Sequence, residues 1–386
     1  MKFFPSVIIK KMKLTVLQEN LNKGLSLTSR LATSRAQVPV LNNVLLLAEK
    51  GQLKLSATNL EIGINYWLGA KVEKEGAISI PAKTITEFVS LLPSGKVVLE
   101  VKDNSLSVSS DSYLANFVGL PASEFPAVPT LKEEKTFSFS SEELLKGISQ
   151  TVFAASQDEG RPVLTGVLFQ LKGEDLVLVA TDGYRLSFKK MKSSKSLKEV
   201  KEFQKGLIIP AKVLGEVEKI IGISPQKEEI SLAITSSSNQ IIFVTPQAEI
   251  VSRLIEGSFP EFEKIIPEKW ETKVVLEKES FLRAVRTASI FARESANIVK
   301  FKIQNSKFKI SANAPQVGDN LIELEAKQEG EENSIAFNSR FILDFLNSTE
   351  ANEISFEMTT PLNPGIFRPV GDSSYFHIIM PVRVQE

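Results

Sequence analysis

Apolar and polar positions follow the same order three times along the chain. Each copy begins with a short strand pattern, continues with a helix whose apolar side chains recur every three or four residues, and ends in paired strand patterns. The starting strands are expected at residues 14–17, 136–139 and 273–276. The following helices carry Leu21 and Leu25, Leu144 and Ile148, and Leu282 and Val285. This order predicts three units of one α+β fold, each with two helices packed on antiparallel sheets.

A second helix pattern recurs at a nearly constant distance. It follows three apolar runs that end in a basic residue, at Lys83, Lys212 and Arg340. Lys83 and Lys212 are 129 positions apart, and Lys212 and Arg340 are 128 apart. A constant period of this kind marks an internal repeat. Segments rich in proline separate the copies, so we predict domains at residues 12–131, 132–267 and 268–386, preceded by an N-terminal extension at 1–11.

The clearest hairpin lies in the middle copy. Two β-rich runs, 163–169 and 176–180, flank Lys-Gly-Glu-Asp at 172–175, a sequence typical of a tight turn. The second run ends in Asp182-Gly183, where glycine permits a positive φ. In the third copy Ala314-Pro315 replaces this Asp-Gly pair. A turn of the same kind is therefore not expected there. Further on, residues 189–205 hold seven lysines without a sustained pattern and are expected to form a solvated loop.

Composition excludes several classes of function. The 386 residues include 46 Lys+Arg and 46 Asp+Glu, so net charge gives no general attraction to nucleic acid or membrane. The chain has no cysteine and one histidine, His377, which excludes disulfides, thiolate zinc sites and histidine pairs. No apolar run reaches the roughly 20 residues of a membrane span. We expect a cytoplasmic protein without membrane contact, bound metal or cofactor.

Sequence motifs for catalysis are missing, whereas basic stripes are present. There is no Gly-rich phosphate loop, metal-spaced cluster or nucleophile elbow, and no pair of carboxylates stands out by spacing. Basic residues lie on one side of the predicted helices, namely Lys23 with Arg30, Lys212 with Lys219, and Arg283 and Arg286 with Arg293. Such stripes suit phosphate contacts. They are also typical of helix ion pairs, since Glu19 precedes Lys23 by four residues, and the pattern leaves both interpretations open.

Four segments, together with the threefold repeat, carry a resemblance to a known family. They read Arg-Pro-Val-Leu-Thr-Gly at 161–166, Ala-Thr-Asp-Gly-Tyr-Arg-Leu at 180–186, Glu-Gly-Ser-Phe-Pro at 256–260 and Ile-Ile-Met-Pro-Val-Arg at 378–383. In this order they resemble the bacterial sliding clamp family, the β subunit of DNA polymerase III, from Met12 to Val384. The resemblance implies a ring-forming, head-to-tail homodimer of clamp-type domains that encircles double-stranded DNA without reading its sequence.

The same resemblance implies partners and site residues. The partners are the replicative DNA polymerase, the clamp loader and other DNA repair and replication proteins, and no enzymatic activity is implied. A peptide-binding cleft is expected at Leu164, Thr181, Gly183, Tyr184, Arg185, Leu186, Pro260, Lys264, Ile265, Ile378, Met380, Pro381, Val382 and Arg383. DNA-facing residues are expected at Lys23, Arg30, Arg35, Lys212, Arg283, Arg286 and Arg293. A dimer interface is expected near Phe117, Ile290 and Phe291.

The chemistry of the implied cleft is consistent with peptide binding. Its Leu, Ile, Pro and Met side chains supply apolar area, and Arg185 and Arg383 are expected to hold carbonyl or carboxylate groups of a peptide. Three features depart from the family: the extension at residues 1–11, Tyr184 where some relatives carry His, and Gln385-Glu386 beyond the usual end. Two alternatives stay open, a repeat scaffold without DNA contact and a hydrolase with an unrecognised carboxylate site.

Overall fold

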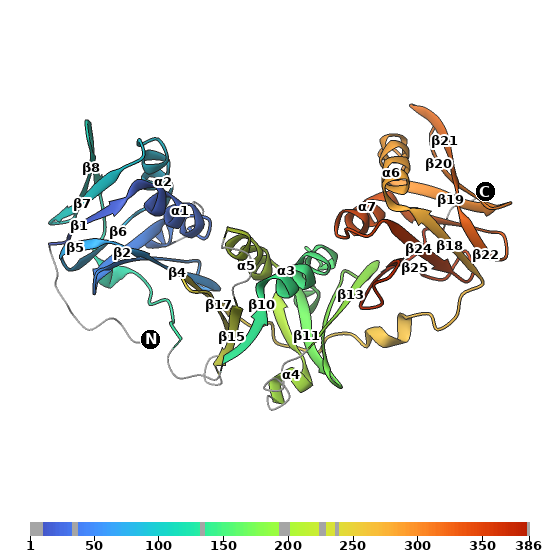
Figure 1. Ribbon diagram of the computed structural model, residues 1–386, viewed down its shortest axis with the longest axis horizontal. Coiled ribbons are helices and arrows are strands. Elements are labelled where there is room, and N and C mark those ends of the chain that lie inside the picture. Colours follow the sequence, from blue (N-terminus) through green and yellow to red (C-terminus); the bar gives the residue numbers. More distant parts are fainter. Residues whose placement is uncertain are drawn as a thin grey trace. The chain divides into compact units, whose positions relative to one another are not determined.

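The structure is a computed structural model that describes residues 11–32, 38–131, 136–192, 201–223, 229–235 and 239–383. Many of its helices and strands are labelled in Figure 1. The chain forms two compact units. The N-terminal unit contains residues 1–141 and 219–254, and the C-terminal unit contains residues 142–218 and 255–386. Each unit joins one terminal repeat to half of the middle repeat. All strand pairs are antiparallel, which agrees with the predicted α+β class.

Two sheets and two helices build the N-terminal unit. One sheet has eight strands in the order β10 (Thr136–Ser140), β15 (Glu229–Thr235), β16 (Gln240–Val244), β17 (Ala248–Arg253), β4 (Ile62–Gly69), β3 (Gln52–Thr58), β2 (Asn43–Glu49) and β6 (Gly76–Pro81). The other has the order β5 (Lys71–Lys74), β1 (Lys13–Leu17), β7 (Lys96–Lys102), β8 (Ser105–Ser110) and β9 (Tyr113–Val118). The helices are α1 (Gln18–Thr28) and α2 (Ala82–Ser90), and the short 3-10 turns are η1 (Pro39–Asn42) and η2 (Ala122–Glu124). The apolar positions that predicted α1, Leu21 and Leu25, are fully buried.

The C-terminal unit repeats this plan with a larger sheet. Its nine strands lie in the order β14 (Leu207–Pro210), β11 (Gly166–Lys172), β12 (Asp175–Thr181), β13 (Arg185–Lys192), β26 (Tyr375–Ile379), β25 (Gly365–Pro369), β24 (Glu353–Met358), β18 (Thr272–Glu277) and β22 (Lys327–Gly330). The second sheet has the order β21 (Gly318–Glu325), β20 (Lys307–Ala314), β19 (Ile298–Gln304) and β23 (Asn333–Asn338). Its helices and 3-10 turns are α3 (Ser141–Ser149), α4 (Lys201–Lys205), α6 (Lys278–Ala292), α7 (Ser339–Asn347), η3 (Val152–Ala154), η4 (Pro162–Leu164) and η6 (Phe262–Ile265), and α5 (Ala211–Ile223) contains the boundary between the units.

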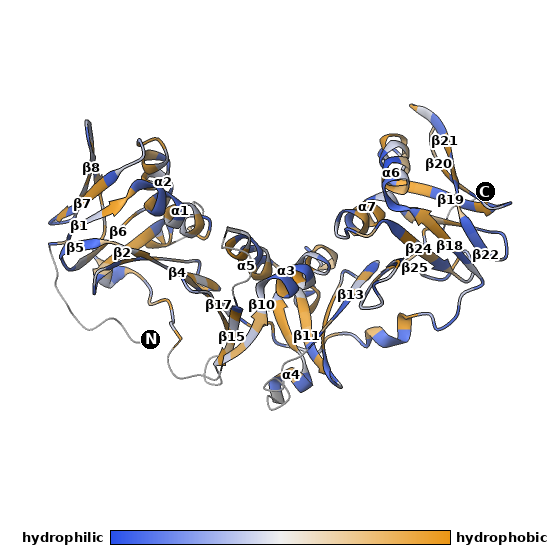
Figure 2. Cartoon of the chain, in the orientation of Figure 1, coloured by the Kyte–Doolittle hydropathy of each residue, from blue (hydrophilic) through white to orange (hydrophobic). Residues whose placement is uncertain are grey.

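Hydrophobic residues follow the predicted periods. Figure 2 shows that β11 is largely hydrophobic, whereas α6 carries hydrophobic and hydrophilic residues together. On α6 the side chains of Phe281, Leu282 and Val285 are buried, and Arg283 and Arg286 are exposed. The helix begins after Glu277, whose carboxylate accepts hydrogen bonds from the main-chain N–H groups of residues 279 and 280. An acceptor at this position satisfies donors that the first turn leaves unpaired.

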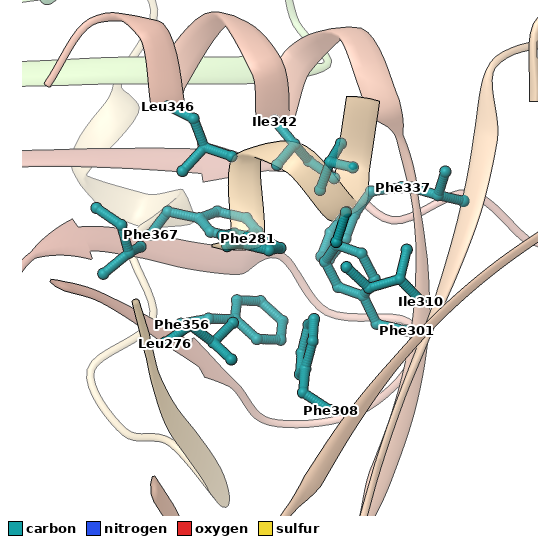
Figure 3. Packing of buried hydrophobic residues seen from close by; sticks show 14 of the residues in the cluster. Leu276, Phe281, Phe301, Phe308, Ile310, Phe337, Ile342, Leu346, Phe356 and Phe367 are labelled. Atoms are coloured by element: carbon teal, nitrogen blue, oxygen red, sulfur yellow. The ribbon is translucent and has the colours of Figure 1, made fainter. Parts of the chain in front are cut away.

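A cluster of phenylalanines forms the core of the third repeat (Figure 3). The rings of Phe281 and Phe308 meet edge to face with centroids 5.7 Å apart, and those of Phe356 and Phe367 stack at 4.7 Å. All four side chains are fully buried. Burial of one such ring stabilises the fold by about 1.5–3 kcal/mol, and favourable ring pairs add about 0.5–1.5 kcal/mol. This core holds α6, α7 and β24–β26 as one support for the neighbouring site.

Most of the predicted elements of the middle repeat are present, and one prediction is wrong. The hairpin forms as expected, with Lys172 paired to Asp175 across β11 and β12. The expected solvated loop at 189–205 is instead strand up to Lys192 and helix from Lys201, and residues 193–200 lie outside the described part. Lys189, inside β13, is almost fully buried because its ammonium group is bound by Asp372 and Ser374.

Candidate functional site

The turn between β12 and β13 is held by its own side chains. Thr181 Oγ1 donates to the carbonyl of Arg185 at 2.6 Å and accepts from the N–H of Gly183 at 3.1 Å. Asp182 Oδ1 accepts from the N–H groups of Tyr184 and Arg185, at 2.8 and 3.0 Å. Gly183 has φ +93°, the left-handed conformation that the sequence predicted for it. Four hydrogen bonds within five residues make this turn rigid.

Arg185 is fixed on all sides. Its Nε donates to Asp182 Oδ2 at 3.1 Å, one terminal nitrogen donates to Asp344 of α7, and the other donates to the carbonyl of Phe153 at 2.6 Å. The guanidinium also lies over the ring of Phe341, 4.5 Å from its centroid. All three nitrogens therefore already have partners. A guanidinium carries five N–H donors and three are used here, so the expectation that Arg185 holds a peptide's carbonyl or carboxylate stays a prediction, while the guanidinium also forms part of the wall of the hollow.

A hollow of about 200 Å³ opens beside this turn. Leu186 and Ile378 at its lining are fully buried, whereas Ile265 and Met380 are 41% and 37% exposed. Its complete lining is Leu164, Thr181, Gly183, Arg185, Leu186, Pro260, Glu261, Phe262, Ile265, Ile378 and Met380. Small-molecule sites typically measure roughly 300–1,000 Å³. This smaller apolar hollow with an open rim suits a few side chains of a peptide better than a whole enclosed ligand.

Nine of the fourteen expected cleft residues line this hollow, and five do not. Tyr184 is exposed, and its carbonyl accepts from the N–H of Met380 at 2.8 Å. Lys264 forms an ion pair with Glu261. Pro381 and Val382 are half-buried, the N–H of Val382 donates to the carbonyl of Ala336 at 2.8 Å, and Arg383 is exposed. The extension Gln385-Glu386 lies outside the described residues.

Sequence reasoning missed two lining residues, Glu261 and Phe262. Phe262 is 5% exposed and belongs to the apolar cluster under the hollow, where its ring lies 6.0 Å from that of Phe188. A usable signal was present, because Phe259 and Phe262 are three residues apart beside Pro260, and their rings meet edge to face at 6.5 Å. Phe259 precedes η6, which begins at Phe262, so the signal is two aromatic side chains close together beside a proline, a pattern that indicates a local apolar contact.

The hollow lies on the seam where the middle and third repeats share one sheet. Strand β13 of the middle repeat pairs with β26 of the third, with Leu186 opposite Ile378. Both strands and the 3-10 turn η6 belong to the C-terminal unit. Because a continuous nine-stranded sheet forms the floor, the hollow is built into the fold and needs no rearrangement to exist.

Next to Leu186 and Ile378, strands β13 and β26 carry a buried polar pair, Ser187 and His377. Nδ1 of His377 and the hydroxyl of Ser187 are 2.7 Å apart, and the imidazole lies between the rings of Phe153 and Phe345. Burial, and then the positive charge of Arg185, hold the pKa of His377 well below its ordinary value. The imidazole is therefore neutral at neutral pH. Nearby, burial raises the pKa of Tyr375, whose hydroxyl lies 2.7 Å from that of Ser348.

The expected DNA-facing residues are mostly exposed. On α6, Arg283, Arg286 and the following Arg293 are exposed, and Arg286 donates to Asn347 Oδ1 at 3.0 Å. Lys212 is exposed and forms an ion pair with Glu159 at 3.5 Å. Arg30 is exposed and Lys23 is half-buried. Arg35 lies outside the described residues. In the described part of the chain Lys23 makes no ion pair with Glu19.

The expected interface residues lie on one edge strand and on helix α6. Phe117 is on β9, the edge of the five-stranded sheet, but its side chain is buried against Phe88, with ring centroids 5.6 Å apart. The exposed apolar side chains of this strand are Leu114 and Val118. In the C-terminal unit Ile290 is 56% exposed and Phe291 is half-buried. Leu321 is exposed on the edge strand β21.

Among the described residues, no group of three or more His, Cys, Asp or Glu side chains is arranged to hold a metal ion. No helix in the same residues has the length and apolar character needed to cross a membrane.

Comparison with known families accounts for nearly the whole chain. The DNA polymerase III beta subunit family matches with its N-terminal domain at residues 12–129, its central domain at 138–261 and its C-terminal domain at 263–383. The chain belongs to this family. Beta sliding clamps of Synechocystis and Bacillus subtilis are 32% and 30% identical to it, covering 97% and 96% of this chain and all of each relative.

Solved structures of sliding clamps have the same fold. The DNA polymerase III beta subunit of Thermotoga maritima has a TM-score of 0.88 and 27% identity, and a sliding clamp of Bartonella birtlesii bound to griselimycin has 0.90 and 29%. Each covers 97% of this chain and is itself fully covered. As a sliding clamp, the chain is a DNA polymerase processivity factor that acts in DNA replication, in a family of non-catalytic proteins. Neither the scaffold nor the hydrolase alternative is supported.

Proposed function

We propose that two copies of the chain close head to tail into a ring around duplex DNA, and that the hollow beside Gly183 tethers partners by short peptides. The partners are the replicative polymerase, the clamp loader and other replication and repair proteins, and the site of action is the cytoplasm. The domains would be residues 12–131, 132–267 and 268–386. The observation that carries the proposal is the preformed apolar hollow on the seam between the middle and third repeats.

The composition of the hollow supports an apolar peptide anchor. Burying one Leu and one aromatic side chain is worth roughly 3–6 kcal/mol at about 1.5–3 kcal/mol each. Ordering of the peptide offsets much of this, so micromolar affinity is expected. Met380 at the rim is exposed and can adapt its rotamers to different side chains. Arg383 is exposed and supplies a cation for a peptide's carboxylate.

The exposed arginines of α6 support contact with the DNA backbone. Arg283, Arg286 and Arg293 point away from the phenylalanine core, and none of the three forms an ion pair within the described residues. Guanidinium groups that contact no base edges attract DNA phosphates regardless of the DNA sequence. This attraction weakens as the salt concentration rises. Contacts of this kind hold a sliding protein loosely, and the closed ring would supply the persistence.

Two edge strands support the ring. Among the described strands β9 pairs only with β8, and β21 pairs only with β20. Each edge leaves main-chain donors and acceptors free and carries exposed apolar side chains. Pairing of β9 with β21 of a second copy would be a heterologous contact, which closes into a ring when the rotation permits.

Retention on DNA tests this function directly. The labelled protein and a clamp loader are incubated with nicked circular DNA and with the same DNA made linear, and bound protein is measured after gel filtration. A ring should stay on the circle and be lost from the ends of the linear form. Equal retention on both forms, or a monomer of 42.6 kDa in light scattering at micromolar concentration, would contradict the proposal.

A further inference from the structure

Two more hollows continue the cleft along residues 264–270, which lead from η6 to β18. The first measures about 360 Å³ and is lined by Lys264, Ile265, Ile266, Pro267, Glu268, Lys269, Thr359, Asn363 and Pro364. The second measures about 240 Å³ and is lined by Pro267, Glu268, Lys269, Trp270, Glu357, Met358, Pro364, Ile366 and Arg368. Ile265 borders both the cleft hollow and the first of these, and Pro267 to Lys269 border both new hollows. The three hollows therefore adjoin one another in sequence within the C-terminal unit, and together they are called the track here.

The main chain along this track is free to pair. Glu268, Lys269 and Trp270 are exposed and belong to no helix or strand. Within the described residues, none of their N–H or C=O groups makes a hydrogen bond, and the next pair along the chain is Glu271 N–H to the carbonyl of Met358. Exposed main-chain groups in an irregular segment are what an extended peptide uses when it adds alongside a protein.

Charges along the track leave one cation without a partner. Lys264 is paired with Glu261, and Arg368 and Lys273 share Glu357 at 3.4 and 3.6 Å. Lys269 is exposed and has no ion-pair partner within the described part of the chain. Beside it, Trp270 is 40% exposed, and the ammonium of Lys273 lies 5.7 Å from the centre of its ring. Glu268 is also exposed and unpaired within the described residues, but Lys269, Arg368 and Lys273 together outnumber Glu268 and Glu357 by one charge. The track therefore favours an acidic group next to an apolar one.

We propose that this track binds the acidic flank of a partner's peptide. The inference rests on the proposed function of the hollow beside Gly183, which takes the apolar anchor. The flank continues past Ile265 as an extended segment, pairs with the free main chain of residues 268–270 and places an Asp or Glu side chain at Lys269. Residues 266–270 can span at most roughly 17 Å at about 3.3 Å per residue, so a flank of about five residues is long enough to follow the track.

Fluorescence anisotropy with four labelled peptides tests this. The first contains one Leu and one Phe among Gly and Ser residues. The second and third add Ser-Asp-Gly-Asp-Ser at its N- or C-terminal end, and the fourth replaces both Asp by Lys at the better end. Each is titrated with the full chain, with Lys269→Glu and Trp270→Ala, and with Lys83→Glu as a matched change at an exposed lysine of the N-terminal unit.

The acidic flank at one of the two ends should tighten peptide binding about three- to tenfold. Lys269→Glu should remove this gain, and this variant should bind the fourth peptide, with Lys in its flank, more tightly than the acidic one. The bare peptide should bind both forms equally, and Lys83→Glu should change nothing. Equal affinity for bare and flanked peptides, or a gain that survives Lys269→Glu, contradicts binding of the flank to the track. Either result leaves the peptide site beside Gly183 in place. If the bare peptide does not bind, both the peptide site beside Gly183 and the binding of a flank to the track are contradicted. A Trp270→Ala change that alters sedimentation but not the flank's effect assigns this surface to a second copy and overturns the proposal.

Discussion

Val128 lies directly over Gly63 in the N-terminal unit: a Cβ at Gly63 would be only 2.6 Å from Cγ1 of Val128. Gly63 is opposite Val251 where β4 and β17 join the first and middle repeats, just as Leu186 is opposite Ile378 where β13 and β26 join the next pair. Val128 therefore takes the room above this seam. The seam in the C-terminal unit keeps its hollow instead.

A larger residue at position 63 should destabilise the N-terminal unit. Gly63→Leu forces its side chain into Val128, and overpacking of this kind typically costs about 1–3 kcal/mol. The midpoint of urea unfolding should fall accordingly. Gly69→Leu is the matched control, because Gly69 ends the same strand with nothing within 4 Å of its Cβ position. Equal midpoints for both variants would show that Val128 yields without cost.

Gly183→Leu should block the cleft without unfolding the protein. Leu60 occupies the corresponding place in the first repeat at φ +75°, in a turn where Thr58 and Asn59 make the same four hydrogen bonds as Thr181 and Asp182. A non-glycine residue is therefore tolerated in this turn, at a backbone cost of about 1–2 kcal/mol. Anisotropy should show at least a tenfold loss of affinity for a Leu- and Phe-bearing peptide, with circular dichroism unchanged. Unchanged affinity would move the anchor site away from Gly183.

Local features of the fold and cleft were predictable, and long-range pairs were not. The repeat, the hairpin and the positive φ of Gly183 depend on neighbouring residues, so periodicity and turn chemistry predict them. The fixed guanidinium of Arg185 depends on Asp344, 159 positions away, and the buried ammonium of Lys189 depends on Asp372, 183 positions away. No local pattern reports such partners. For this reason the ion pairs that hold Arg185 were not foreseen, and a lysine expected in solvent lies inside a sheet.

Reversal of charge on α6 should weaken retention on circular DNA. Arg283→Glu and Arg286→Glu together change the local charge by four units, and exposed helix positions tolerate such changes with little effect on stability. The double variant should leave circular DNA faster and show a shallower dependence of retention on salt. Lys302→Glu on strand β19, which is also exposed, is the control and should behave as the unchanged protein. Equal loss from both variants would indicate a general charge effect in place of a DNA-facing helix.

Stability should decline as pH falls through the ordinary pKa of histidine. His377 is the only histidine, and its pKa is held low in the folded chain by burial and by Arg185. The unfolded chain binds a proton near pH 6.5, whereas the folded chain does not, so acid favours unfolding. The effect is absent above about pH 7.5 and reaches at most about 1.4 kcal/mol per pH unit below 6.5. Aspartates and glutamates titrate mainly below about pH 5, which leaves a window for this group alone.

Calorimetry between pH 5 and 8 should show the slope in the unchanged protein and its loss in His377→Asn, whose amide can still bond Ser187. A slope that persists in the variant would assign the proton to another group.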